Sequence, residues 1–128
     1  MAANNGTSNK GAALIYCRTV AEGQGENTAL DRQEAACIEH AQSLGYTVGR
    51  ITREVASGIQ LAERPLLSQD REDLKSGEFG ALVVYSADRL SRDRAHLVTV
   101  AEECRAAGVE IVTVVPTGGT LGEGVWPW

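Results

Sequence analysis

The stretch ALVVYSADRLSRD, residues 81–93, decides the fold. Its first six residues are nearly all apolar, and such a run is typical of a strand buried on both faces of a parallel sheet. A charged segment follows at once, and it includes Asp88, Arg89 and Arg92. In open α/β sheets the binding crevice lies at the carboxyl ends of the strands. The stretch therefore predicts a buried strand that delivers charged side chains to a crevice.

The segments on either side alternate between strand patterns and helix patterns. This alternation predicts an α/β fold: a three-layer sandwich with a mostly parallel central sheet of four or five strands, flanked by helices. Residues 47–55 alternate only in part, which favours an exposed or edge strand. The expected strands are 13–17, 47–55, 81–86 and 109–115, and the expected helices are 28–45, 65–77 and 94–108.

The helix boundaries follow from capping residues. Thr28 is a plausible N-cap and Gly45 a plausible end for the first helix. Pro65 opens the second helix at a position where proline is favoured. The apolar spacing predicts which residues face the core: Leu30, Cys37, Ile38, Ala41 and Leu44 on the first helix, and Leu97, Val100, Ala101 and Cys104 on the third.

Length and composition limit the classes of protein to which the chain can belong. The 128 residues suit one domain, which we expect to span residues 12–115. Residues 1–11 are polar and read as a disordered tail without a secretory signal, and residues 116–128 are rich in glycine and read as an irregular tail. No apolar run approaches the roughly 18 residues that a membrane span needs.

The cysteines and histidines indicate a reducing compartment and no metal. The chain has three cysteines, an odd number, each inside an apolar segment. Buried thiols of this kind are typical of a cytoplasmic protein. There is no CxxC pair, and the two histidines belong to no Cys/His ligand pattern, so a metal site is not expected.

The positive charge is carried almost entirely by arginine. The net charge of −5 does not suggest a protein that coats nucleic acid unaided. Of twelve basic residues, however, ten are arginine, whose planar fork binds phosphate at two points. Codon usage in a GC-rich genome is the alternative explanation. Arg18, Arg64 and the segment 87–93 each follow a predicted strand and should meet at one edge of the sheet, where they form either an anion site or a set of solvated loop charges.

The segment 87–93 itself suits a phosphate. If a helix begins near Arg89, then Arg89 and Arg92 are one turn apart and face the same way. Two guanidinium groups can neutralise charge on phosphoryl oxygens, and Asp88 can orient an arginine or exchange a proton. No GxxxxGK[ST] loop is present, which argues against a P-loop nucleotide enzyme.

Four motifs in order carry a family resemblance. They are IYCRTVAEGQ (15–24), LDRQ (30–33), ASG (56–58) followed by ERP (63–65), and VVYSADRLSRD (83–93). Over residues 13 to about 115 the chain resembles the catalytic domain of serine recombinases, the resolvase/invertase family. The resemblance implies a serine that attacks a DNA phosphate and forms a 5′-phosphoserine link, followed by rotation and rejoining without metal or cofactor. The site residues that it implies are Arg18, Gln33, Arg64, Asp88, Arg89 and Arg92.

The chain departs from the family at the residue that does the chemistry. Val20 occupies the position of the family's nucleophilic serine, so we expect the chain to be inactive as written. Thr19 carries a hydroxyl, but neighbouring residues of an extended strand point to opposite sides, and a one-residue slip would turn every side chain of the strand around. Ser57, Ser86 and Ser91 are poorer candidates. The loop from Gly58 to Arg64 is also about one residue longer than usual.

The resemblance also implies partners. Family members bind DNA largely through a separate domain that follows a long dimer-forming helix, and this sequence contains neither. We therefore expect DNA binding through a domain missing from this chain, and a homo-oligomer, dimer or tetramer, in the full-length family. The alternative is a non-catalytic regulatory or phosphate-binding module that forms mixed oligomers with an active recombinase. A third reading is a flavodoxin-like domain that binds another anion.

Overall fold

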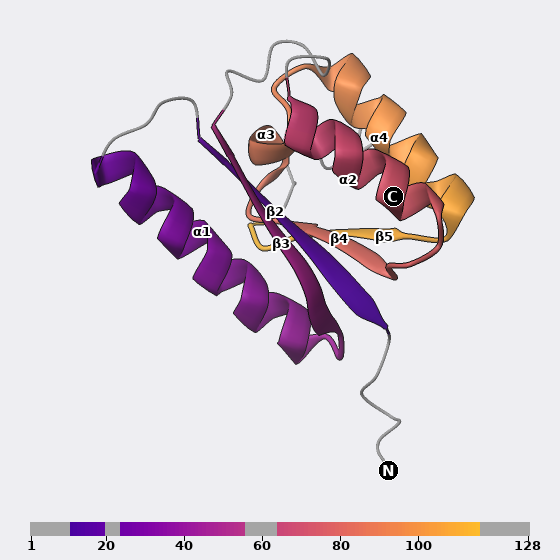
Figure 1. The fold of residues 1–128 in the computed structure, drawn as a ribbon, viewed down its shortest axis with the longest axis horizontal. Coiled ribbons are helices and arrows are strands. Elements are labelled where there is room, and N and C mark those ends of the chain that lie inside the picture. Colours follow the sequence, from indigo (N-terminus) through magenta and orange to yellow (C-terminus); the bar gives the residue numbers. More distant parts are fainter. Residues whose placement is uncertain (1–10, 20–23, 56–63, 116–128) are drawn as a thin grey trace.

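The computed structural model describes residues 11–19, 24–55 and 64–115. Its sheet has four strands, all parallel, in the order β3-β2-β4-β5 (Figure 1). This confirms the predicted α/β fold and the edge position of the second predicted strand. The strands are β2 (Ala12–Thr19), β3 (Thr47–Val55), β4 (Ala81–Val84) and β5 (Glu110–Thr113), and the helices are α1 (Gln24–Ser43), α2 (Pro65–Lys75), α3 (Ala87–Leu90) and α4 (Arg94–Ala107).

Helices cover both faces of the sheet, which gives three layers. Helix α1 lies on one face, and α2 and α4 lie on the other (Figure 1). Because side chains alternate along a strand, β2 supplies both cores. Leu14 and Tyr16 pack with the α2 and α4 side, whereas Ala13, Ile15 and Cys17 pack with the α1 side. Burial on both faces explains why the strand segments are continuous apolar runs.

A β-bulge shifts the register between β2 and β3. Ala13 pairs with Val48, and Leu14 pairs with Arg50, so Gly49 is the extra residue. A Cβ atom on Gly49 would lie 2.9 Å from the Cβ of Ala12 and 3.1 Å from Cε1 of Phe79. Glycine is therefore needed for this close approach of the two strands.

The first helix begins earlier than predicted. It starts at Gln24, so Thr28 lies within the helix and the prediction of Thr28 as its N-cap is wrong. Gly25 and Asn27 have low helix propensity, which favoured a later start in the sequence. The end is as predicted, because the helix stops at Ser43 and Gly45 takes a φ of +95°. The predicted core residues of the helices are all buried or packed against the core.

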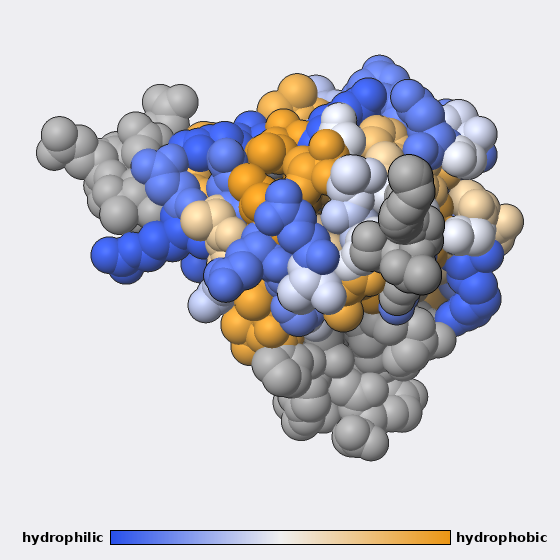
Figure 2. Space-filling model, turned by 90° about the horizontal axis from the view of Figure 1, so that it is seen from below, coloured by the Kyte–Doolittle hydropathy of each residue, from blue (hydrophilic) through white to orange (hydrophobic). Residues whose placement is uncertain are grey.

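The surface mixes apolar and hydrophilic residues. Figure 2 shows both kinds interspersed on the face seen from below. Within the described ranges, the large apolar residues that stay exposed are Ile51, Val55, Leu66 and Val115, with exposed fractions of 38–47%. Isolated exposure of this kind is normal for a folded domain. The expectations for the two tails, and those for Val20 and Ser57, fall outside the described residues.

Candidate functional site

Two buried arginines bind the carbonyl groups of α3. Arg18, the penultimate residue of β2, donates from Nε to the carbonyl oxygen of Arg89 at 2.9 Å and from Nη2 to that of Asp88 at 2.6 Å. Arg64, just before α2, donates from Nη2 to the carbonyl oxygen of Leu90. Both are almost fully buried, with exposed fractions of 1% and 0%. The predicted meeting of three arginine-bearing segments at the carboxyl edge is confirmed.

A tyrosine and a glutamate that the sequence analysis missed hold Arg64. The Tyr16 hydroxyl accepts from Nε and Nη2 of Arg64 at 3.2 and 2.9 Å, and it donates to Oε1 of Glu54 at 2.7 Å. The Glu54 carboxylate also accepts the backbone N–H groups of Leu66 and Leu67 in the first turn of α2. Glu54 therefore acts as the side-chain cap that α2 otherwise lacks, and it fixes the helix directly after Arg64.

The hydroxyl of Tyr16 stays protonated in this network. Burial is the main reason that the pKa of Tyr16 lies well above its usual value, and the hydrogen bond to Glu54 raises it further, while Arg64 acts in the opposite direction. A signal for the pair existed in the sequence: Glu54 is a charged residue on the inward-facing set of β3, and a charge there needs a partner.

Gln33 holds the end of β2 in place. Its side-chain amide accepts from the backbone N–H of Arg18 at 3.2 Å and donates to the Arg18 carbonyl at 3.1 Å. Gln33 is buried, with 3% exposed. Two of the expected site residues are thus in contact, but through the backbone of Arg18: α1 fixes the strand from which the Arg18 side chain extends.

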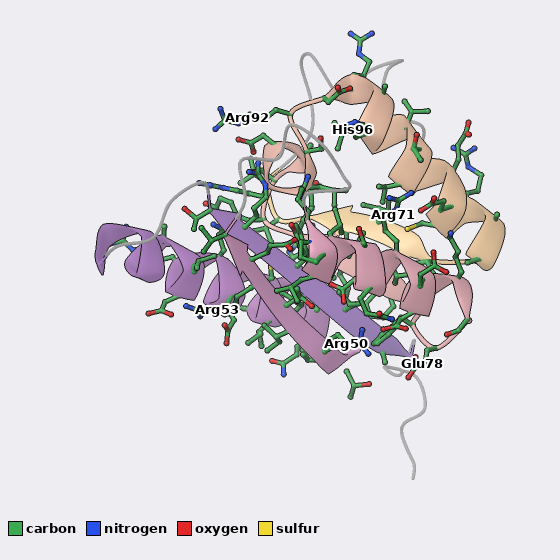
Figure 3. The ribbon with its side chains drawn as sticks, turned by 45° about the horizontal axis from the view of Figure 1, so that its top comes forward. Arg50, Arg53, Arg71, Glu78, Arg92 and His96 are labelled. Carbon is green, nitrogen blue, oxygen red and sulfur yellow. The ribbon has the colours of Figure 1, made fainter. Side chains whose placement is uncertain are left out.

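Arg89 and Arg92 lie differently from the predicted arrangement. The helix that contains Arg89 ends at Leu90, and Ser91 is extended, with φ −167° and ψ 152°. The two arginines are therefore not one helical turn apart, and that prediction is wrong. Arg89 is half-buried and donates from Nη1 to the Arg18 carbonyl at 3.4 Å. Arg92 is exposed between α3 and α4 (Figure 3).

Three arginines of the described ranges are paired with carboxylates, whereas three at the carboxyl edge of the sheet are not. Arg50, Arg53 and Arg71 form ion pairs with carboxylates on neighbouring helices. Within the same ranges, Arg64, Arg89 and Arg92 form none, and the buried Nη1 of Arg64 has no hydrogen-bond partner. The positive charges at the carboxyl edge are therefore not neutralised by these carboxylates.

The neighbouring positive charges perturb the pKa of Arg18. Burial lowers the pKa of its guanidinium, and the charges of Arg64, Arg92 and Arg89 lower it further. Like charges held close together stabilise a bound anion, because the anion relieves their repulsion. Guanidinium forks match the oxygens of a phosphate group, so the arrangement suits a phosphate or a phosphodiester.

The hydroxyl groups of the site are poorly placed for attack on a large substrate. Thr19 is 1% exposed, and strand alternation puts it on the α1 side, opposite to Arg18. Ser91 is fully buried and its Oγ accepts the backbone N–H of Asp93 at 3.0 Å. Ser86 donates to the Asp88 carboxylate, which is exposed. The Thr19 and Ser91 hydroxyls are thus buried, and the Ser86 hydroxyl is bound to a carboxylate.

Other kinds of site receive no support from the described ranges. They contain no group of three His, Cys, Asp or Glu side chains that could hold a metal ion. None of their helices is long and apolar enough to cross a membrane.

Comparison with known proteins gives consistent matches. The family description "Resolvase, N terminal domain" matches residues 13–121. A Bacillus subtilis (strain 168) protein named "Putative DNA recombinase" is 33% identical over 101 residues, which are 78% of this chain but only 20% of that protein. The chain thus spans about a fifth of that relative's length.

Solved structures share the fold. The catalytic domain of the ISC1926 TnpA protein, an IS607-like serine recombinase, superposes with a TM-score of 0.74 at 23% identity, over 85% of this chain and 71% of that one. The N-terminal catalytic domain of TP901-1 integrase superposes with a TM-score of 0.68 at 25% identity, over 80% of this chain and 76% of that one.

Proposed function

The chain belongs to the resolvase N-terminal domain family, and from this premise we propose that its carboxyl-edge arginines bind the phosphate of a DNA strand that is to be cut and rejoined. The reaction proposed is that of a serine recombinase: a side-chain hydroxyl attacks the phosphorus, the 3′-oxygen leaves, and a 5′-phosphoserine link conserves the phosphodiester energy. The chain would serve as the catalytic domain of such an enzyme, acting with DNA and with further copies as a dimer or tetramer.

One observation carries the proposal. Arg64, Arg89 and Arg92 lack carboxylate partners in the described ranges, although three other arginines have them. Negative charge builds on the phosphoryl oxygens in the transition state, so fixed guanidinium donors lower the barrier. Arg89 and Arg92, which reach the surface, are the proposed phosphate ligands, and the buried Arg18 and Arg64 are proposed to add positive charge behind them. Gln33 and Glu54 are positioning residues, because they act through Arg18 and Arg64.

Val20 sets the activity expected of the chain as written. Valine has no hydroxyl, so no covalent link to DNA forms, although the phosphate site is kept. A retained site without a nucleophile supports a second role: the chain would enter oligomers with an active recombinase and lower their activity.

Covalent capture tests the first role. A Val20→Ser variant, fused to the DNA-binding part of a recombinase with a known site, is incubated with a nicked substrate that traps the cleaved state. We expect a protein–DNA adduct on a denaturing gel, none with Val20 retained, and none when Arg64→Gln is added. Site binding by the Val20→Ser fusion without any adduct would overturn the proposal. The second role is tested by adding the unaltered fusion to an active relative and measuring whether recombination falls.

A further inference from the structure

A second hollow adjoins the arginine site, between α1 and the segment that follows β4. It measures about 200 Å³ and is lined by Ala29, Arg32, Gln33, Tyr85 and Arg89. We propose that it binds the nucleotide next to the reacting phosphate, with Arg32 as a ligand of that neighbouring phosphate. The inference rests on the proposed function, because Arg89 and Gln33 border both sites.

The charge of the hollow favours an anion. Its lining contains two arginines and no carboxylate. The carboxylates nearest to Arg32 in the sequence, Asp31 and Glu34, are turned to β3, where both accept from Nη1 of Arg53 at 2.9 and 2.8 Å. Arg32 is exposed and has no ion pair within the described ranges. It is therefore available to a ligand.

The remaining walls suit one nucleotide unit. Gln33 has both ends of its amide bound to the Arg18 backbone, so it forms a fixed wall. Tyr85 is half-buried, and its ring offers a flat surface on which a sugar or base can pack. Pockets for whole drug-sized ligands measure roughly 300–1,000 Å³. The smaller hollow here fits part of a strand whose remainder continues past Arg89.

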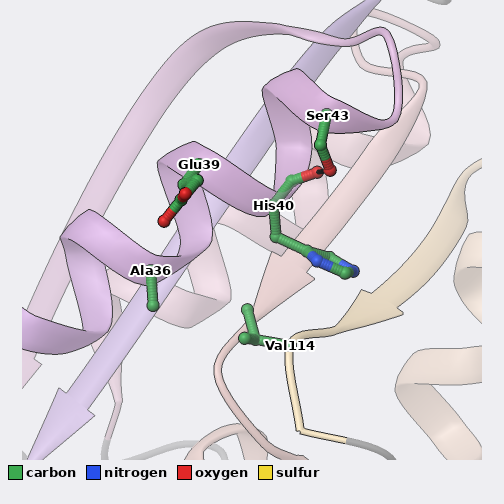
Figure 4. A pocket seen from close by; sticks show the side chains of 5 residues that line it. All are labelled: Ala36, Glu39, His40, Ser43 and Val114. Carbon is green, nitrogen blue, oxygen red and sulfur yellow. Dashed lines mark hydrogen bonds between the residues drawn. The ribbon is translucent and has the colours of Figure 1, made fainter.

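The next hollow along α1 lacks these features. It is lined by Ala36, Glu39, His40, Ser43 and Val114 (Figure 4). The Ser43 hydroxyl donates to the backbone carbonyl of His40, and the only charged group of fixed sign is the Glu39 carboxylate. A carboxylate repels phosphate, so the proposed path of the strand ends at Arg32 and does not extend along the helix.

The test compares probes with one and two phosphates. The 128-residue chain, labelled with ¹⁵N, is titrated with thymidine 5′-phosphate and with the 5′-phosphorylated thymidine dinucleotide, and Kd is measured from NMR shifts. We expect the dinucleotide to bind about threefold to tenfold more tightly, with shifts at Arg32 and Tyr85 that the mononucleotide does not cause. Arg32→Gln should reduce the difference to less than about twofold, and Arg32→Lys should restore part of it.

Arg105→Gln is the matched control. Arg105 is exposed in the last turn of α4. This turn comes just before the start of β5, so it lies at the amino ends of the strands, opposite to the carboxyl edge. Replacing Arg105 removes the same charge as replacing Arg32. Equal losses in the two glutamine variants would overturn the inference in favour of long-range attraction. Binding near Arg18 and Arg89 with no gain from the second phosphate would overturn the inference alone. No shift near Arg18 or Arg89 with either probe would overturn the proposed function as well.

Discussion

Replacing Tyr16 by phenylalanine tests the network that holds Arg64. The change removes one oxygen atom that accepts two hydrogen bonds from Arg64 and donates one to Glu54. A hydrogen bond to a charged group contributes about 1.5–3 kcal/mol, and the change leaves Arg64 and Glu54 each without a buried partner. Arg64 still donates to the Leu90 carbonyl, and Glu54 still accepts from two backbone N–H groups. We therefore expect the free energy of unfolding to fall by about 3 kcal/mol.

Urea unfolding measures this loss. With a slope of about 2 kcal/mol per molar urea, the midpoint should fall by about 1.5 M. Tyr85→Phe is the control, since no hydrogen bond of its hydroxyl is found within the described ranges, and it should change stability by less than about 0.5 kcal/mol. Glu54→Gln should also destabilise, and the double variant should lose less than the sum of the two. Equal midpoints for Tyr16→Phe and Tyr85→Phe would refute the network.

Three further changes have defined outcomes. Arg71 lowers the pKa of Glu103 through two hydrogen bonds, so Glu103→Gln should lower the free energy of unfolding by about 1 kcal/mol at pH 7. The difference in stability between the two proteins should vanish as the pH falls through the lowered pKa of Glu103. A difference in urea midpoints that stays constant with pH would contradict this. Burial raises the pKa of Tyr46 to about 12, so the stability that its protonated hydroxyl contributes is complete below pH 10 and is lost as the pH rises through 12. In an ultraviolet titration of tyrosine ionisation, Tyr46→Phe should lack one transition at high pH. Gly49→Ala should lower the free energy of unfolding by about 1–3 kcal/mol, because the added Cβ would clash with the Cβ of Ala12. An unchanged midpoint of thermal unfolding would show that the bulge shifts to make room for the added atom.

Much of the fold follows from local pattern. The apolar run before Asp88 predicted a strand buried on both faces, and β4 is buried at all four positions. Alternation of strands and helices predicted a parallel sheet, and the chain order of the arginine-bearing loops placed them at one edge. These predictions succeed because periodicity and connection rules act over short stretches of sequence.

The parts that were missed depend on contacts between distant segments. Tyr16 and Arg64 are 48 residues apart, and only the packing of α2 against the sheet brings them together. The start of α1 at Gln24 differs from the low helix propensity of Gly25, which local pattern alone would place outside the helix. The break after Leu90 separates Arg89 from Arg92. The three hydrogen bonds to α3 carbonyls come from Arg18 and Arg64, which lie in other parts of the chain.

The most direct test of the central claim is to identify the residue that becomes bonded to DNA. The Val20→Ser fusion is trapped on its nicked substrate, digested with protease and nuclease, and the modified peptide is sequenced by mass spectrometry. The account predicts a nucleotide linked through its 5′-phosphate to the residue at position 20, and no modified peptide when Arg18→Gln or Arg64→Gln is added. A link at Thr19, Ser86 or Ser91, or a link that survives loss of both arginines, would contradict it.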